Sequence, residues 1–259
     1  MGAALRRAWR VPALLGLILG GLVLALSARA VGGASWFLRP AGQGLIVRWM
    51  RALNRVVGLR VWVVCQPLRA PALVVANHIS WLDVPALASV LPMTFVAKAD
   101  VRRWPLLGRL AGLAGTRFLD RTSISAVRPL LERIAVRLRD GHSCAVFPEG
   151  TSTAGDRVRA FFPALFQAAV DAGCPVQPVA IEYGHGTSGD PLAPFTGEQD
   201  FAVHLWRLLG RAHTDVTLSF LAPMDARGGE RRDLARRAHA SLEQWLFTDL
   251  VPVRRAVAS

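Results

Sequence analysis

At residues 76–83 the chain reads Ala76-Asn77-His78-Ile79-Ser80-Trp81-Leu82-Asp83, between an apolar run at Leu73–Ala76 and a helical pattern at Val84–Leu91. The apolar run predicts a buried strand, so the stretch lies at a strand-to-helix turn. Two residues five apart lie about 140° apart on one helix, so His78 and Asp83 meet only if His78 stays in the loop. In that geometry the carboxylate accepts the imidazole N–H and leaves the other ring nitrogen free as a base. The stretch therefore predicts a His–Asp dyad.

A structural interpretation of this stretch is also open. Ser80 and Asp83 fit a helix capping box, in which the carboxylate satisfies backbone N–H groups and takes no part in chemistry. The residues of the stretch alone do not separate the two interpretations, so the downstream sequence has to decide between them.

The chain beyond this stretch alternates strand-like and helix-like segments. Apolar runs predict strands at Val61–Cys65, Leu73–Ala76, Thr94–Ala97, Arg117–Leu119, Cys144–Phe147, Val176–Ile181 and Val216–Leu221. Helical periodicity is found near Val84–Leu91, Leu106–Leu113, Ser123–Leu138, Phe161–Ala172, Phe201–Leu209 and Arg231–Phe247. This alternation predicts an α/β fold with a layered, mixed sheet flanked by helices. Gly184–Thr196, rich in turn-forming residues, is expected to be a surface loop or lid.

The positive charge of the chain is concentrated at its N-terminal end. The formal net charge is +13, and no acidic residue precedes Asp83. The same segment contains ten arginines, namely Arg6, Arg7, Arg10, Arg29, Arg39, Arg48, Arg51, Arg55, Arg60 and Arg69. Such asymmetry favours binding to nucleic acid or to an anionic membrane surface. The apolar runs between these arginines favour the membrane.

An uncharged run of 18 residues, Val11–Ala28, predicts an N-terminal membrane-anchoring helical segment. A cleaved signal peptide is the alternative, since Ala28-Arg29-Ala30 loosely resembles a cleavage site. The run exceeds the roughly 7–15 apolar residues usual in signal peptides, which favours a retained anchor. Whether the run spans the bilayer or re-enters it stays open, because both of its flanks are basic.

Residues Leu45–Val57 form an amphipathic, basic helical pattern. Apolar side chains fill one arc, and Arg48, Arg51 and Arg55 fill the opposite arc. We expect this helix to lie in a membrane interface, and the alternative is a helix packed on the protein with a solvated arginine face. The sequence thus divides into an N-terminal anchor and amphipathic basic helix at 1–58 and a second domain at 59–259.

Four short blocks, each at a predicted strand end, resemble the glycerolipid acyltransferases, whose type member is 1-acyl-sn-glycerol-3-phosphate acyltransferase. The blocks are Asn77-His78 with Asp83, then Gly115-Thr116-Arg117-Phe118-Leu119-Asp120-Arg121, then Phe147-Pro148-Glu149-Gly150-Thr151, and then Val176-Gln177-Pro178-Val179-Ala180-Ile181. The likeness runs from about Val61 to Phe220. It implies an acyltransferase domain at 59–259.

The resemblance also implies roles for individual residues. His78 is expected to be the catalytic base and Asp83 its orienting partner. The expected substrate-binding residues are Asn77, Ser80, Arg121, Glu149, Gly150 and Thr151, with Arg121 on the acceptor phosphate and Glu149 and Thr151 on glycerol hydroxyls. Four further cations are candidates for the same site, namely Lys98, Arg117, Arg157 and Arg159. Ser80 lacks the turn of a serine nucleophile, so we expect direct attack on a thioester without an acyl-enzyme.

These expectations define a membrane-associated O-acyltransferase of lipid metabolism. It transfers a fatty acyl group from acyl-CoA or acyl-carrier protein to a lysolipid at the cytoplasmic face of the inner membrane. No metal or other cofactor is expected, because the sequence has no Cys/His cluster and no Gly-rich nucleotide loop. No nucleic-acid partner is expected in this interpretation. The competing class is a non-enzymatic protein that binds anionic lipid or nucleic acid.

The third block bears on the choice of acceptor. Many members of the family that use a phosphate acceptor read Glu-Gly-Thr-Arg-Ser, whereas Ser152 follows Thr151 here. Arg157 and Arg159 lie close enough in sequence to replace the missing arginine. The segment also resembles the branch that acylates lyso-ornithine lipid. Because Arg121 is present, the sequence favours 1-acylglycerol-3-phosphate as the acceptor, with lyso-ornithine lipid as the alternative.

Overall fold

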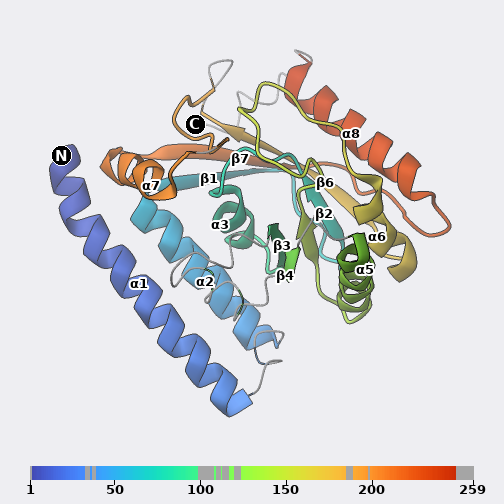
Figure 1. The fold of residues 1–259 in the computed structure, drawn as a ribbon, viewed down its shortest axis with the longest axis horizontal. Coiled ribbons are helices and arrows are strands. Elements are labelled where there is room, and N and C mark those ends of the chain that lie inside the picture. The colour runs from blue at the N-terminus through green and yellow to red at the C-terminus, as the bar shows by residue number, and fades with distance from the viewer. Residues whose placement is uncertain are drawn as a thin grey trace.

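A mixed, seven-stranded sheet forms the centre of the protein (Figure 1). The structure is a computed structural model that describes residues 2–32, 36, 39–98, 108, 112, 117–119, 124–184, 189–197 and 199–248. The strands are β1 (Leu59–Val64), β2 (Leu73–Ala76), β3 (Thr94–Lys98), β4 (Arg117–Leu119), β5 (Cys144–Val146), β6 (Val176–Tyr183) and β7 (Thr214–Phe220). Their order across the sheet is β1-β7-β6-β2-β5-β3-β4. All seven predicted strands are present, and the prediction of a mixed sheet is confirmed.

The direction of the strands decides where a functional site can form. Strands β2, β3, β4, β5 and β6 run parallel to one another, and the β6–β7 pair is antiparallel. The carboxyl ends of these five strands therefore share one edge of the sheet. Ligand sites of open α/β sheets form outside such an edge. The loop that begins at Asn77 leaves β2 at this edge, near the middle of the sheet.

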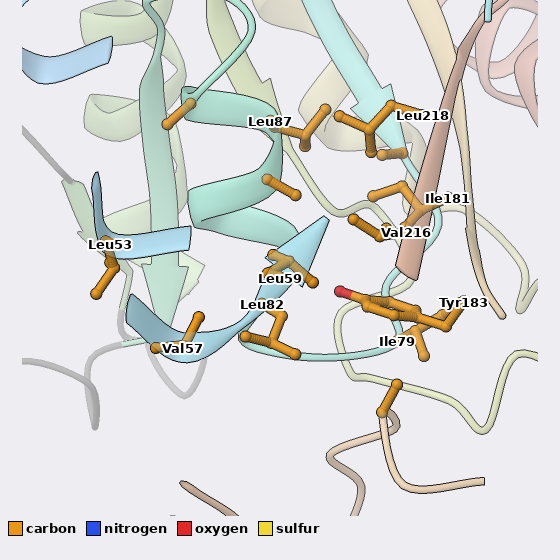
Figure 2. Packing of buried hydrophobic residues seen from close by; sticks show 14 of the residues in the cluster. Leu53, Val57, Leu59, Ile79, Leu82, Leu87, Ile181, Tyr183, Val216 and Leu218 are labelled. Atoms are coloured by element: carbon orange, nitrogen blue, oxygen red, sulfur yellow. The ribbon is translucent and has the colours of Figure 1, made fainter. Parts of the chain in front are cut away.

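Helices cover both faces of the sheet. They are α1 (Ala3–Gly32), α2 (Pro40–Val57), α3 (Asp83–Ala88), α5 (Ile124–Arg139), the 3₁₀ turn η3 (Pro163–Phe166), α6 (Gln167–Ala172), α7 (Phe201–Gly210) and α8 (Arg231–Phe247). Side chains of β2 alternate between the two cores: Val74 packs with α1, α2, α3 and α7, whereas Leu73 packs with α5, α6 and α8. Figure 2 shows part of the first core, where α2, α3, β6 and β7 meet. The helix predicted at Leu106–Leu113 lies outside the described residues, apart from Gly108 and Gly112.

The two N-terminal helices form an antiparallel hairpin that projects from one side of the sheet (Figure 1). Trp49 Nε1 donates to the Leu17 carbonyl at 3.2 Å, and the Arg10 guanidinium lies beside Gly58, the C-cap residue of α2. The start of α1 therefore lies next to the end of α2. Gly58 adopts a φ of 80°, a conformation that favours glycine, and the proposed domain boundary at 58 coincides with this cap.

Arginines fix the first turns of α1 to the C-terminal end of α7. Arg10 is 5% exposed, and its guanidinium donates to the carbonyls of Leu209, Arg211 and Ala212. Arg6 Nε donates to the Gly210 carbonyl at 2.8 Å. The last carbonyls of a helix lack intrahelical partners and carry partial negative charge, so cations are favourable there. Part of the N-terminal basic cluster thus binds the protein itself.

Helix α2 confirms the predicted amphipathic pattern but not the predicted environment of its apolar arc. Leu53 and Val57 are buried in the core shared with the sheet, and Asn54 Nδ2 donates to the Pro85 carbonyl at 3.1 Å. Arg48 and Arg55 are exposed. The apolar arc packs in the core that α2 shares with α1 and α3, as in the alternative of a helix packed on the protein, and its contact with a membrane interface stays a prediction.

Helix α1, by contrast, presents an uncharged face outward. Among the described residues it is the one helix long and apolar enough to cross a membrane by length and composition. Its exposed large apolar side chains are Leu5, Trp9, Leu15, Leu19, Val23, Leu24 and Leu26. Monomeric soluble proteins rarely leave such a row uncovered. The predicted anchor run at Val11–Ala28 lies wholly inside this helix.

Candidate active site

His78 and Asp83 meet as the sequence predicts. His78 lies in the loop after β2, and Asp83 is the first residue of α3. His78 Nδ1 lies 2.8 Å from Asp83 Oδ2. A carboxylate accepts hydrogen bonds, so Nδ1 carries the hydrogen and Nε2 keeps its lone pair. The His78 side chain is 24% exposed, which allows a ligand to reach the ring.

Asp83 is fully buried, and hydrogen bonds surround its carboxylate. Besides His78, the backbone N–H groups of Ile79 and Ser80 donate to Oδ2 at 2.8 and 3.0 Å. The hydroxyl of Tyr183 donates to Oδ1 at 2.6 Å. Several donors stabilise the ionised form of a buried carboxylate. The carboxylate therefore binds the loop N–H groups, as the capping interpretation expects, and also contacts His78, as the dyad interpretation expects.

The imidazole of His78 stacks on an aromatic ring. The ring centroids of His78 and Phe147 lie 4.1 Å apart, with an angle of 18° between their planes. Phe147 follows β5, the neighbour of β2 in the sheet. The stack and the Asp83 bond together fix the plane and the rotation of the imidazole.

Glu149 joins two loops at the site. Its Oε1 accepts from the backbone N–H of His78 at 2.7 Å, and its Oε2 accepts from that of Arg159 at 2.9 Å. Burial raises the pKa of the Glu149 carboxyl, and these two N–H bonds oppose the rise. Glu149 is 4% exposed, and both of its oxygens hold backbone groups, which favours a structural role; the predicted bond to glycerol hydroxyls stays a prediction.

Replacing Glu149 by glutamine tests this role. The amide has one acceptor oxygen, so one of the two backbone N–H groups then faces an NH₂ group. We expect the free energy of unfolding to fall by about 1–3 kcal/mol, the cost of a buried donor without a partner. Urea denaturation measures the free energy of unfolding. The control is Glu132→Gln, at an exposed residue of α5, which should change this free energy by less than about 0.5 kcal/mol. A raised KM for the acceptor at unchanged stability would instead assign Glu149 to the substrate.

Asn77 and Ser80 are buried, and their predicted substrate-binding roles stay predictions. Asn77 donates to the Ile181 carbonyl at 2.9 Å and accepts from the Ile181 N–H at 2.8 Å, so its amide extends the β2–β6 pairing. The Ser80 side chain is fully buried, and its hydroxyl finds no hydrogen-bond partner within the described part of the chain.

The third block and the segment after it border the same loop. Thr153 donates its N–H to the His78 carbonyl at 2.8 Å, and the N–H bond of Arg159 brings that residue beside Glu149. Gly150 is partly exposed, with a φ of 77°. The side chains of Thr151, Arg157 and Arg159 are exposed. Their roles, and that of Gly150, stay predictions.

Two of the remaining predicted cations lie on β3 and β4, at one end of the strand order. Lys98 is the last residue of β3, at the same edge as His78, and Arg117 opens β4, where it pairs with Val96. Arg121 lies outside the described residues. The roles of Lys98, Arg117 and Arg121 stay predictions.

The loop at residues 189–197 packs beside the dyad, as expected for a lid or surface loop at Gly184–Thr196. The Phe195 N–H donates to the Ile79 carbonyl at 2.9 Å, and the Ser152 hydroxyl donates to the Phe195 carbonyl. Ser152, the residue at the arginine position of phosphate-using relatives in the third block, thus holds this loop and brings no charge.

Two residues of this arrangement are missing from the predicted site. Phe147 opens the third block, and Tyr183 ends β6, two residues after the fourth block. A signal for Tyr183 exists in the sequence, because it is the single tyrosine of the chain and a buried hydroxyl needs a partner. The sequence does not identify Asp83 as this partner, because the two residues are 100 positions apart.

Known proteins are similar to this chain in sequence. The family model described as "Acyltransferase" matches residues 60–182. The lyso-ornithine lipid O-acyltransferase of Pseudomonas aeruginosa is 40% identical over 255 residues, which cover 97% of this chain and 98% of that protein. A 1-acyl-sn-glycerol-3-phosphate acyltransferase of Neisseria gonorrhoeae is 34% identical over 160 residues, covering 62% of this chain and 63% of that protein.

A solved structure supports the same fold. The crystal structure of the 1-acyl-sn-glycerophosphate acyltransferase PlsC from Thermotoga maritima matches with a TM-score of 0.67 and 22% identity, covering 94% of each chain. The predicted α/β fold and the predicted resemblance are confirmed. The chain therefore belongs to the acyltransferase family that contains the lysophospholipid acyltransferases, and it is an acyltransferase.

Proposed function

We propose that the protein transfers a fatty acyl group from a thioester, acyl-CoA or acyl-carrier protein, to the free hydroxyl of a lysolipid at a membrane surface. The observation that carries the proposal is the buried Asp83 carboxylate 2.8 Å from Nδ1 of the accessible His78. This pair leaves Nε2 of His78 as a base that the edge of the sheet presents to a ligand.

The transfer uses His78 twice. Nε2 takes the proton of the acceptor hydroxyl while the hydroxyl oxygen attacks the thioester carbonyl carbon. The C–S bond then breaks, and the thiolate leaves with the proton that His78 returns to it. Ser80 is fully buried, which supports direct transfer without an acyl-enzyme. This transfer requires no metal or other cofactor.

We propose lyso-ornithine lipid as the acceptor. Relatives named lyso-ornithine lipid O-acyltransferase match this chain over 97% and 92% of its length, whereas the 1-acylglycerol-3-phosphate acyltransferase of Neisseria gonorrhoeae matches over 62%. An ornithine head group carries no phosphate, and Ser152 brings no charge to the third block. Arg121 favours 1-acylglycerol-3-phosphate as the acceptor in the sequence. These observations favour lyso-ornithine lipid instead, and 1-acylglycerol-3-phosphate becomes the second candidate.

A competition between the two acceptors at equal concentration tests this choice. We expect lyso-ornithine lipid to have a kcat/KM at least about tenfold higher, the scale of one missing charge-assisted hydrogen bond. Ser152→Arg is expected to raise kcat/KM for 1-acylglycerol-3-phosphate about tenfold, and Ala154→Arg, two residues further on an exposed site, serves as its control. Preference of the unchanged enzyme for the phosphate acceptor would overturn the choice. Acylation of neither lipid would count against the proposed function.

The proposed membrane contact is the outward face of α1. Over residues 5–26 this face is uncharged, because Arg6, Arg7 and Arg10 turn toward α7, and the exposed Arg29 lies in the last turn of the helix. It is continued by α7, where Trp206 is exposed under the Arg7 guanidinium. Tryptophan and arginine suit the boundary between lipid and water. Since α1 and α2 return to the same side, we propose that the hairpin enters the bilayer from the cytoplasmic face, where thioester donors are found.

Charging this face is expected to release the protein from membranes. An aspartate near the middle of a membrane-embedded helix costs about 2.5–3.5 kcal/mol. The variant Leu19→Asp/Val23→Asp should therefore move from the vesicle pellet to the supernatant in a sedimentation assay at low salt. Val136→Asp alters an equally exposed apolar residue on α5, across the sheet, and should stay in the pellet. Full retention of the double variant would contradict the proposed contact.

A further inference from the structure

The second oxygen of the Asp83 carboxylate has one hydrogen-bond donor among the described residues, the hydroxyl of Tyr183. Oδ2 carries the bonds to His78 and to the loop N–H groups, whereas Oδ1 accepts from Tyr183 at 2.6 Å. Tyr183 comes from the carboxyl end of β6, and Figure 2 shows its ring among Ile79, Leu82 and Ile181. The ring is 6% exposed.

Packing alone does not require a hydroxyl at this position. Phenylalanine would fill the same space without a polar atom, and burying a hydroxyl is unfavourable unless it is bonded. Burial and the Asp83 charge raise the pKa of Tyr183 well above its ordinary value, so the phenol stays protonated and donates. A short bond between a phenol and a carboxylate is of the strong, charge-assisted kind.

We propose that Tyr183 is a positioning residue of the acyl transfer, acting on His78 through Asp83 as the third member of a Tyr–Asp–His chain. This role rests on the proposed function. The phenol holds the carboxylate in the plane that meets Nδ1 and draws negative charge toward Oδ1. Both effects govern how strongly Asp83 favours the protonated imidazole that forms during the transfer.

Among the described residues, few other charged side chains lie near the hydrogen-bonded series Tyr183–Asp83–His78. Glu149 lies across the loop and contacts the His78 backbone. Asp190 lies in the loop after β6 and is neutralised by Arg211, whose Nη1 contacts both carboxylate oxygens at 2.7 Å. Besides His78, the Tyr183 phenol is therefore the one side chain that donates to Asp83 among the described residues.

Replacing Tyr183 by phenylalanine removes only the hydroxyl. We expect kcat to fall about tenfold, the scale of one hydrogen bond to a charged group, while KM for the lysolipid stays unchanged. Without the phenol the carboxylate can turn out of the plane that meets Nδ1, which accounts for the lower kcat. Its negative charge is then drawn less toward Oδ1 and favours the imidazolium, which is inactive as a base, so the acid limb of the pH–rate profile should move upward.

Two controls separate positioning from packing. Val216 pairs with Tyr183 in the β6–β7 ladder, so Val216→Ala disturbs the same region without touching Asp83. This control should lower the melting temperature but leave the acid limb in place. In an Asp83→Asn background, Tyr183→Phe should change kcat by less than about twofold, because two residues that act through one group are not additive. A tenfold loss in that background would show that Tyr183 acts independently of Asp83, which overturns the proposal.

The single tyrosine of the chain permits a test that does not depend on folding of the variant. Global incorporation of 3-fluorotyrosine labels position 183 alone and makes the phenol a stronger donor. The acid limb should then move downward, opposite to Tyr183→Phe, and the ¹⁹F resonance should shift when Asp83 becomes asparagine. An unmoved limb in the fluorinated enzyme refutes the role. If no lysolipid is acylated, the proposed function fails, while the ¹⁹F shift still reports whether the Tyr183–Asp83 bond exists.

Discussion

Replacing His78 by alanine is expected to lower kcat for lysolipid acylation at least about a hundredfold, the usual scale for loss of a general base. The imidazole is the partly exposed half of the His78–Asp83 pair, and within the described residues Asp83 contacts no other imidazole. The alanine variant keeps the loop, because the backbone N–H and carbonyl of His78 retain their bonds to Glu149 and Thr153.

The matched control is His213→Ala. His213 also pairs with an aspartate, since its Nε2 lies 3.2 Å from Asp215 Oδ2 at the start of β7. This pair lies outside the proposed site, so its loss should change kcat by less than about twofold on the scale of surface substitutions. Radiolabelled acyl transfer measures both variants. Near-normal turnover by a folded His78→Ala protein would refute the mechanism.

Replacing Asp83 by asparagine should cost a similar factor, at least about a hundredfold in kcat, without unfolding the protein. The asparagine oxygen can take the place of Oδ2 and accept from His78 and the loop, while its NH₂ can donate to the Tyr183 oxygen. The shape of the site is thus kept, and the negative charge that stabilises the imidazolium is lost. The effect on kcat therefore reports the charge.

Thermal unfolding and kinetics together decide this prediction. We expect a folded Asp83→Asn protein with an acceptor KM near that of the unchanged enzyme, because Asp83 is fully buried and does not contact the substrate. Asp215→Asn, at the other His–Asp pair, provides the control. A kcat within a factor of about three of the unchanged enzyme would leave Asp83 a structural capping residue only.

Much of the fold follows from local patterns. The apolar run Leu73–Ala76 forms the predicted strand because β2 lies in the interior of the sheet, and all four of its residues are buried. The expected helix at Phe161–Ala172 divides instead into the turn η3 and the short helix α6, where Pro163 begins the turn. The packing of Leu53 and Val57 of α2 on the protein could not be predicted, because a helical pattern states which face is apolar and not what covers it.

The candidate site, like the fold, could be predicted from the sequence only in part. The dyad was predictable because His78 and Asp83 are five residues apart across one turn, so the turn itself brings them together. The role of Glu149 was not, since its carboxylate reaches a backbone N–H 71 residues away, which only the adjacency of β2 and β5 makes possible. Asn77 and Ser80 have polar side chains beside His78, yet their burial follows from the packing of β6 and α3 over them.

The sequence by itself determined the strand-to-helix turn, the His–Asp dyad within it, the apolar run of α1 and the family. These are properties of neighbouring residues, and local backbone geometry is sufficient to express them. Only the tertiary structure decided that Tyr183, 100 residues from Asp83, donates to its carboxylate, and that Arg10 binds the end of α7. Such contacts depend on the order and direction of the strands in the sheet. The local periodicity of the sequence does not determine these, because it is compatible with many arrangements of distant segments.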